Sequence, residues 1–171
     1  MGIAADLQYS FPPPNLVQRL GQRFVSSRGG TWVMARTLPA LDTAVGRLTG
    51  GRQSVPSIAS ALPVADLTTT GRKSGLRRTT HLICIPIGDT LALVGTNFGQ
   101  PLTPDWVANL EANPQASLTF RGASVEVVAR PATAAEFEEV MTAAAQIFVG
   151  YARYRQRITE RRIRIFVLEA A

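Results

Sequence analysis

The sequence is poor in the residues that build disulfides and metal centres. Cys84 is the only cysteine and His81 the only histidine, so an intramolecular disulfide is excluded and no metal site is expected. We expect Cys84 to be buried and inert, and His81 to be a core or barrel-wall residue. Lysine is equally scarce, because Lys73 is the only lysine among 18 basic residues.

Long apolar runs and phosphate-binding fingerprints are also missing. No run reaches the roughly 18 apolar residues of a membrane span, and the N-terminus has no signal-peptide pattern. Neither G-x-G-x-x-G nor a P-loop occurs. A cytoplasmic protein, or one peripheral at the inner face of a membrane, is expected. The net charge of +6 and pI of about 10.7 favour anionic partners: a phosphorylated cofactor, nucleic acid or anionic lipid.

Short β-branched runs separated by turn residues dominate the second half of the chain. Gly88-Asp89 and Arg121-Gly122 each separate two such runs, which predicts two hairpins. This pattern indicates an α+β fold with a mainly antiparallel sheet closed into a small barrel. The predicted strands cover residues 64–71, 79–87, 90–97, 116–120, 124–131 and 163–170.

Helices are predicted on both sides of this strand-rich region. Residues 1–14 end in "FPPP" and are interpreted as an extended or disordered tail. Helical patterns follow at 15–27 and 31–51, then at 103–114 with Thr103 as N-cap and Pro104 at the first helical position. The last predicted helix, 133–157, begins with a capping box formed by Thr133 and Glu136.

The stretch "TTTGRKSGLRR", residues 68–78, concentrates positive charge around one turn. Four cations lie within seven residues: Arg72, Lys73, Arg77 and Arg78. Like charges so close together repel unless an anion neutralises them, and arginine and lysine both suit phosphate and carboxylate groups. The alternative is a solvated hairpin turn. We favour an anion site.

A second cluster combines aromatic residues with arginines near the C-terminus. Phe148, Tyr151 and Tyr154 recur every three residues and share one face of the predicted helix. The pattern itself favours packing against the core, although two tyrosines could also wall an aromatic ligand and donate protons. The arginines between 153 and 164 raise a nucleic-acid alternative, but Glu160 interrupts the run, so no nucleic-acid partner is expected.

The order of several motifs resembles the deazaflavin-dependent nitroreductases, which use coenzyme F420. The segments "LTTTGRKSG", "IPIGDTLALVG", "PDWVANLEANPQASL", "VVARPAT" and "YARYRQR" carry this resemblance from about residue 67 to 168. It implies a split β-barrel like that of FMN-binding proteins. We accordingly divide the chain into an N-terminal tail and helical segment, 1–60, and a cofactor-binding barrel domain, 61–171.

The resemblance also implies roles for individual residues. Arg72, Lys73 and Arg78 match positions that bind the phosphate and oligoglutamate tail of F420. The expected surroundings of the deazaflavin ring are Thr96, Asn97, Pro104, Asp105, Trp106, Asn109 and Phe148. Tyr151, Tyr154 or Thr96 would deliver a proton or hydrogen-bond the acceptor.

The implied activity is hydride transfer from reduced F420 to an electrophilic acceptor: a quinone, an enone or a nitroaromatic compound. A non-catalytic F420 carrier and an FMN-binding split-barrel oxidoreductase remain alternatives. Residues 15–50 could lie on a membrane surface, or could cover the barrel or a homodimer interface.

Overall fold

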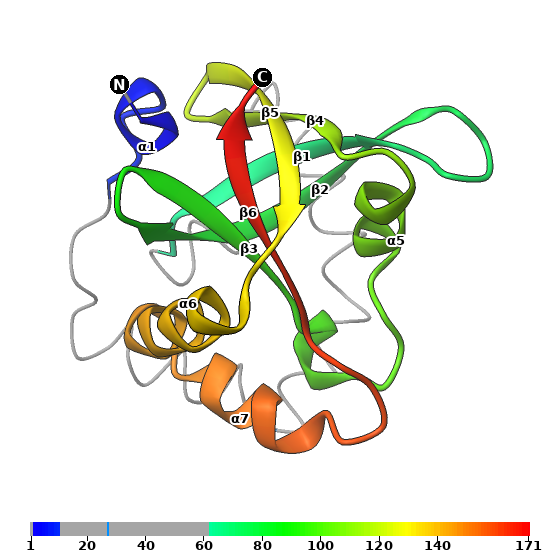
Figure 1. Ribbon diagram of the computed structural model, residues 1–171, viewed down its shortest axis with the longest axis vertical. Helices are drawn as coiled ribbons and strands as arrows, with labels where there is room; N and C mark the ends of the chain where they lie inside the picture. The colour runs from blue at the N-terminus through cyan, green and yellow to red at the C-terminus, as the bar shows by residue number, and fades with distance from the viewer. Residues whose placement is uncertain (1, 11–26, 28–61) are drawn as a thin grey trace.

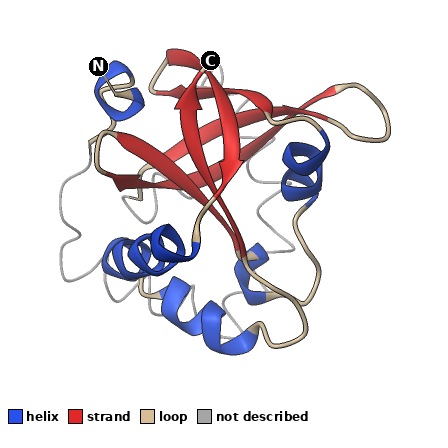
Figure 2. Ribbon diagram, viewed as in Figure 1, coloured by secondary structure: helices blue, strands red, loops and turns tan. Residues whose placement is uncertain are grey.

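The structure is a computed structural model that describes residues 2–10, 27 and 62–171. In this part of the chain, six strands form a closed barrel in the order β1-β2-β3-β6-β5-β4, and every neighbouring pair is antiparallel (Figures 1 and 2). The strands are β1 (Val64–Thr70), β2 (Arg77–Ile87), β3 (Thr90–Gly95), β4 (Gln115–Phe120), β5 (Ala123–Pro131) and β6 (Arg164–Ala170). The expected strands and the antiparallel barrel are confirmed.

The two predicted hairpins are confirmed, and their turns show why these residues form them. Gly88 has a φ of 53° between β2 and β3. Arg121 and Gly122 have φ angles of 50° and 91° between β4 and β5. Positive φ at the centre of a two-residue turn matches the twist of the flanking strands.

The helices lie around the barrel, and side chains of α1 (Ile3–Asp6) and α5 (Asp105–Ala112) join its buried cluster. The other described helices are the 3₁₀ turn η1 (Asn97–Gly99), α6 (Ala134–Ile147) and α7 (Gly150–Arg157). In Figure 1, α5 lies beside the barrel below the β1–β2 loop, and α6 and α7 lie together at its lower end. The capping box of Thr133 and Glu136 is confirmed at the start of α6.

Two buried clusters hold these layers together. The first fills the barrel with side chains such as Leu67, Leu93 and Leu118, all fully buried. The second joins Ile85 and Val94 of the barrel wall to the inner faces of α6 and α7. Helix α7, which carries the predicted tyrosines, is therefore fixed to β2 and β3 of the barrel.

The expectation of an extended or disordered tail is wrong for residues 2–10. Ile3 and Leu7 of this segment are buried in the barrel cluster. The Tyr9 hydroxyl accepts a hydrogen bond from the Cys84 N–H at 3.1 Å and lies 2.6 Å from the Pro63 carbonyl, to which it can donate. Apolar burial and these hydrogen bonds stabilise a helix that is too short to be stable by itself.

Two predicted helix boundaries are also wrong. The N-cap of α5 is Pro104, with ψ at 144°, so Thr103 lies before the cap and no side chain caps this helix. The predicted helix 133–157 is broken, because Phe148 is extended (φ −144°, ψ 113°) between α6 and α7. Its ring packs directly on Gly150, where an added Cβ would lie 2.1 Å from the Phe148 Cε1 atom.

The helices predicted at 15–27 and 31–51 lie outside the described residues. The division at residue 60 remains a prediction.

Candidate functional site

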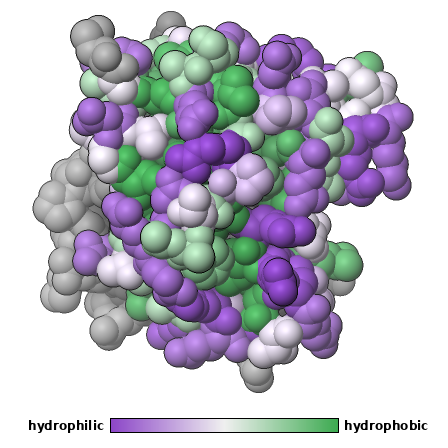
Figure 3. Space-filling model, viewed as in Figure 1, coloured by the Kyte–Doolittle hydropathy of each residue, from purple (hydrophilic) through white to green (hydrophobic). Residues whose placement is uncertain are grey.

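The cationic turn forms a compact loop between β1 and β2. The Gly71 N–H donates to the Leu76 carbonyl at 2.8 Å, and the Gly75 N–H donates to the Gly71 carbonyl at 2.8 Å. Gly75 has a φ of 67°, a conformation that glycine adopts without a steric penalty. In Figure 1 the loop projects at the upper right, and Figure 3 shows that end of the molecule as mostly hydrophilic.

Asn109 of α5 ties this loop to the body of the protein. Its side-chain oxygen accepts a hydrogen bond from the Arg72 N–H at 3.0 Å. Its side-chain NH₂ donates to the Thr69 Oγ1 at 3.1 Å, at the end of β1. Asn109 is buried, so these bonds are shielded from water and fix where the cations begin. Asn109 therefore positions the loop.

The cations of the loop are exposed, and most are available to a ligand. Within the described residues, the side chains of Arg72, Lys73 and Arg78 make no hydrogen bond or ion pair. Arg77 differs, because its Nη2 donates to the Ser117 Oγ at 2.8 Å. Exposed guanidinium and ammonium groups held on one anchored loop suit a flexible ligand that carries phosphate and carboxylate groups. The donor set fits the anionic part of F420.

The loop after β3 has an unusual backbone. Thr96 is buried, and the next residues Asn97, Phe98 and Gly99 have φ angles of 47°, 56° and 76°. The Asn97 side-chain NH₂ donates to the Leu102 carbonyl at 2.9 Å, which closes the loop ahead of α5. Non-glycine residues rarely adopt this conformation, and such strain concentrates at functional sites. Phe98 remains 39% exposed at the tip.

The predicted aromatic residues form one buried cluster. The ring centroids of Phe148, Tyr151 and Tyr154 lie 6.0 to 6.4 Å apart with edge-on geometry. Each is at most 6% exposed, so the packing interpretation is confirmed. Burial raises the pKa of the Tyr151 phenol, and the nearby Cys84 and Tyr154 groups raise it further. Tyr151 is therefore a neutral phenol at neutral pH, whose hydroxyl can donate a hydrogen bond.

The start of α5 presents a polar edge above a buried aromatic residue. Trp106 is 5% exposed and packs edge-on against Phe166 in the barrel, with ring centroids 6.1 Å apart. Pro104 is half-buried and Asp105 is exposed.

The elements that carry the predicted site residues follow one another down the right side of Figure 1, from the cationic loop past α5 to the Asn97–Gly99 turn and α7, and we call this arrangement the strip. Asn109 joins the cationic loop to α5, and α5 follows the Asn97–Gly99 turn in the chain. Gly99 packs against Tyr154, since a Cβ on Gly99 would lie 2.9 Å from the Tyr154 Cδ1. The cationic loop and α7 do not meet, because they lie at opposite ends of the view in Figure 1. A long ligand could follow such a strip.

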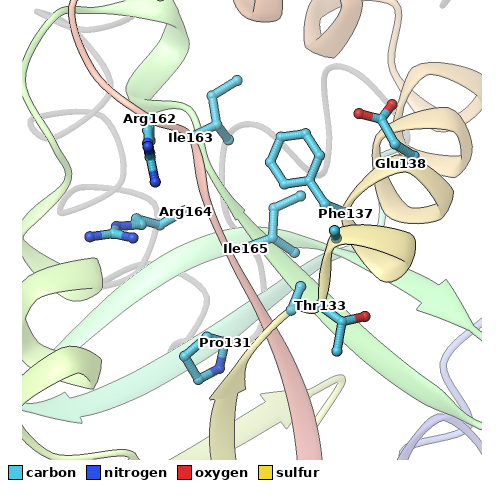
Figure 4. Close-up of a pocket in the computed structure, with 10 residues that line it drawn as sticks. Pro131, Thr133, Phe137, Glu138, Arg162, Ile163, Arg164 and Ile165 are labelled. Atoms are coloured by element: carbon cyan, nitrogen blue, oxygen red, sulfur yellow. The ribbon is translucent and has the colours of Figure 1, made fainter.

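A pocket of about 410 Å³ lies between β6 and the start of α6, and none of the predicted site residues lines it. Figure 4 shows Ile163, Ile165 and Phe137 on one side of the chain and Arg162 and Arg164 on the other. The pocket has an apolar wall and two arginines, of which Arg164 is paired with Glu111, so it offers fewer free cations than the loop. The anionic part of the cofactor therefore fits the cationic loop better than this pocket.

Sequence reasoning missed the role of Arg161. Its guanidinium donates to the backbone carbonyls of Gly95, Thr96 and Gln100 at 2.9 to 3.4 Å. Nothing in the local sequence distinguishes this arginine from its neighbours. Its partners lie more than 60 positions earlier in the chain.

Other arginines of the same run are also engaged within the protein. Arg155 forms a two-point ion pair with Glu138, at 2.8 and 2.9 Å. The Arg164 Nε lies 3.1 Å from a Glu111 carboxylate oxygen. The run is therefore not a continuous free cationic surface, which weakens the nucleic-acid alternative.

The chain is similar in sequence to known proteins. A family model described as F420H(2)-dependent quinone reductase matches residues 39–170. An F420H(2)-dependent quinone reductase of Mycobacterium tuberculosis is 36% identical over 91 residues, which are 53% of this chain and 60% of that protein. A putative F420H(2)-dependent quinone reductase of Mycobacterium bovis matches with the same identity and coverage. The chain thus matches 60% of the length of these curated relatives.

Solved structures share the fold. An F420-H2 dependent reductase superposes with a TM-score of 0.57 at 31% identity, over 63% of this chain and 94% of that one. A structure described as a domain-swapped dimer gives a TM-score of 0.59 at 27% identity, over 82% of this chain and 99% of that one. A heme storage protein of Vibrio cholerae, with a TM-score of 0.50 at 13% identity, over 77% of this chain and 90% of that one, shares the fold only. The split-barrel class expected from the sequence is confirmed.

Proposed function

The chain belongs to the F420H(2)-dependent quinone reductase family, and on this premise we propose that it transfers a hydride from reduced F420 to a quinone. The expected F420-dependent family is confirmed, and its description favours a quinone over a nitroaromatic acceptor. The observation that carries the proposal is the exposed cationic loop that Asn109 anchors to α5. An FMN molecule has one phosphate and would neutralise only part of the positive charge of the loop.

On the cofactor side, Arg72, Lys73 and Arg78 bind the phosphate and the carboxylates of the tail. Within the part of the chain that the structure describes, their side chains are unpaired while the loop backbone is already anchored, so binding costs little conformational entropy of the backbone. Asn97, Pro104 and Asp105 line the ring-binding part of the strip. Trp106, Asn109 and Phe148 are buried and shape it from behind.

On the acceptor side, bound F420 supplies the hydride, and the protein supplies orientation and a proton. Reduction of a quinone to a hydroquinone consumes one hydride and one proton. Thr96, Tyr151 and Tyr154 are hydroxyl donors, and the raised pKa keeps Tyr151 protonated. A neutral donor hydrogen-bonds the quinone oxygen and stabilises the negative charge that develops there.

The cofactor assignment is tested by titrating the full chain with F420 and with FMN while following cofactor fluorescence. Tight FMN binding without F420 binding would contradict the proposal. Lys73→Glu should weaken F420 binding at least about tenfold, since hydrogen bonds to charged groups contribute about 1.5–3 kcal/mol. Arg162→Glu makes the same charge change outside the strip and should have little effect. Equal losses for both variants would point to net charge instead of the loop.

Turnover separates an enzyme from a non-catalytic F420 carrier. F420H2 oxidation should be followed with a soluble quinone, an enone and a nitroaromatic compound at matched concentrations. We expect the quinone to react fastest. Binding of F420 with no oxidation by any acceptor would support the carrier.

Two further features of the assembly are proposed. A solved relative described as a domain-swapped dimer favours a homodimer, which light scattering after size exclusion would detect. Among the described residues, no helix is long and apolar enough to cross a membrane. Residues 15–50 are our candidate for a peripheral membrane contact of a cytoplasmic protein, because Trp32, Leu38 and Leu41 are interspersed with arginines. Flotation with anionic liposomes tests this contact, and no co-flotation would remove it.

A further inference from the structure

Arg161 gathers the backbone on both sides of the strained turn after β3. Its Nη1 donates to the Gly95 carbonyl at 3.0 Å, and its Nη2 donates to the Thr96 carbonyl at 2.9 Å. Nη2 and Nε also reach the Gln100 carbonyl at 3.2 and 3.4 Å. The planar guanidinium can hold several acceptors in a fixed arrangement, which a lysine ammonium cannot do. The guanidinium therefore brackets Asn97, Phe98 and Gly99.

The bracketed residues need such support. Asn97 and Phe98 have left-handed φ angles of 47° and 56°, and neither is glycine. Asparagine tolerates left-handed backbone, but at a bulky residue such as Phe98 this conformation persists only where the surroundings hold it. The Asn97 bond to the Leu102 carbonyl supports the turn from the other side. Without Arg161, the turn keeps only part of its restraint.

The same turn contacts the buried tyrosine cluster. A Cβ at Gly99 would lie 2.9 Å from the Tyr154 Cδ1 and 3.4 Å from the Arg157 Cδ. Thr96, one of the proposed hydroxyl donors, is itself one of the residues whose carbonyl Arg161 binds. A shift of the turn therefore moves Thr96 and removes the packing surface of Tyr154 together.

We propose that Arg161 is a positioning residue: it holds the turn from Gly95 to Gln100 against α7, so that Thr96 and Tyr154 keep their relative geometry. The inference rests on the proposed function, because it gives the geometry a role in acceptor reduction. Arg161 binds neither the cofactor nor the acceptor. It acts through the backbone that it holds.

The kinetic test compares Arg161→Ala and Arg161→Lys with Arg162→Ala. Misplacing a reacting group by about 1 Å can cost about 100-fold in rate, so we expect kcat to fall about 10- to 100-fold for Arg161→Ala. The lysine variant should lie between it and wild type, because a point charge reaches fewer carbonyls. The affinity for F420 should fall less than kcat does, because Arg161→Ala disturbs Asn97 beside the ring but leaves intact the cationic loop that binds the tail. Arg162→Ala should behave as wild type.

A second test needs no cofactor. Chymotrypsin cleaves after aromatic residues, and Phe98 is 39% exposed at the tip of the turn. Mass spectrometry should show cleavage after Phe98 at least about tenfold faster in Arg161→Ala than in wild type or Arg162→Ala, because cleavage requires the turn to open. Urea unfolding of each variant reports the fraction folded.

These outcomes separate the inference from the proposed function. A wild-type protein that does not oxidise F420H2 refutes the function, and the cleavage rates still decide whether Arg161 holds the turn. Wild-type kcat and wild-type cleavage in Arg161→Ala would overturn the inference. If that variant does not fold, the same two readouts in Arg161→Lys decide. A kcat loss that the unfolded fraction fully explains would also overturn it.

Discussion

Replacing Asn109 with alanine should lower both stability and cofactor affinity. The substitution leaves the Arg72 N–H and the buried Thr69 hydroxyl without the partners that Asn109 provides. An unsatisfied buried polar group costs about 1–3 kcal/mol, and the better helix propensity of alanine returns up to about 0.7 kcal/mol. The free energy of unfolding should therefore fall by about 1–2 kcal/mol. For a chain of this length, that lowers Tm by about 2–8 °C.

The loss of affinity has a separate cause. Without Asn109 the start of the cationic loop is no longer held on α5, so the binding free energy must also cover ordering of the loop. We expect the F420 dissociation constant to rise about tenfold. Urea unfolding followed by circular dichroism and a fluorescence titration with F420 measure the two effects on the same preparation.

Asn113→Ala is the matched control on the same helix. Asn113 is the C-cap residue of α5, and its side-chain oxygen accepts a hydrogen bond from the Gln115 N–H beyond the helix at 3.1 Å. The Asn113→Ala variant should be modestly less stable than wild type, and its affinity for F420 should be unchanged. The reasoning fails if Asn109→Ala is as stable as wild type, or if both variants lose affinity equally.

Other expectations follow from burial and from ion pairs. Gly150→Ala should cost about 1–3 kcal/mol in urea unfolding, since its Cβ would overlap the buried Phe148 ring; an unchanged midpoint would show that the ring moves freely. Hydrogen bonds from Arg130 lower the pKa of Glu136 to about 2, so its contribution is complete above the unfolded value of 4.5 and lost as pH falls towards 2. Glu136→Gln should abolish that part of the acid destabilisation, and a wild-type acid profile would contradict this. Burial raises the pKa of Cys84 to about 12, so iodoacetamide should modify Cys84 at pH 8 only after unfolding; rapid modification of the folded protein would refute its burial.

Local signals explain which parts of the fold were predicted from the sequence. Each hairpin turn contains a glycine, Gly88 or Gly122, that adopts positive φ without a steric penalty, and the paired strands adjoin the turn in the chain. The capping box at the start of α6 is likewise complete within four residues. Such signals need no knowledge of what the segment packs against.

The wrong predictions depend on contacts between distant segments. The spacing of Phe148, Tyr151 and Tyr154 fits one helix, yet the Phe148 ring turns into the core and the helix breaks there. The segment at residues 2–10 has no local sign of order, because its partners are Pro63 and Cys84.

The candidate site divides in the same way. The cationic loop was predicted because its charges are adjacent in sequence. Asn109 was predicted as a neighbour of the ring but not as the anchor of the loop, and Arg161 was not predicted, because both act through hydrogen bonds to backbone far away in the chain. Neighbouring charges in the sequence show which groups could bind a ligand. Contacts between distant segments show which residues orient those groups.

The unequal length of β2 and β3 has a consequence for protein engineering. In the described residues, β2 pairs with β3 only from Cys84 onwards, so the half of β2 from Arg77 to Ile83 pairs with β1 alone. An unpaired strand edge is a template for intermolecular pairing, and charged side chains protect against it. Arg77 and Arg78 lie on that edge, so they guard against self-association as well as serving the loop. Removing the charge of Arg78 to weaken F420 binding should therefore also promote aggregation.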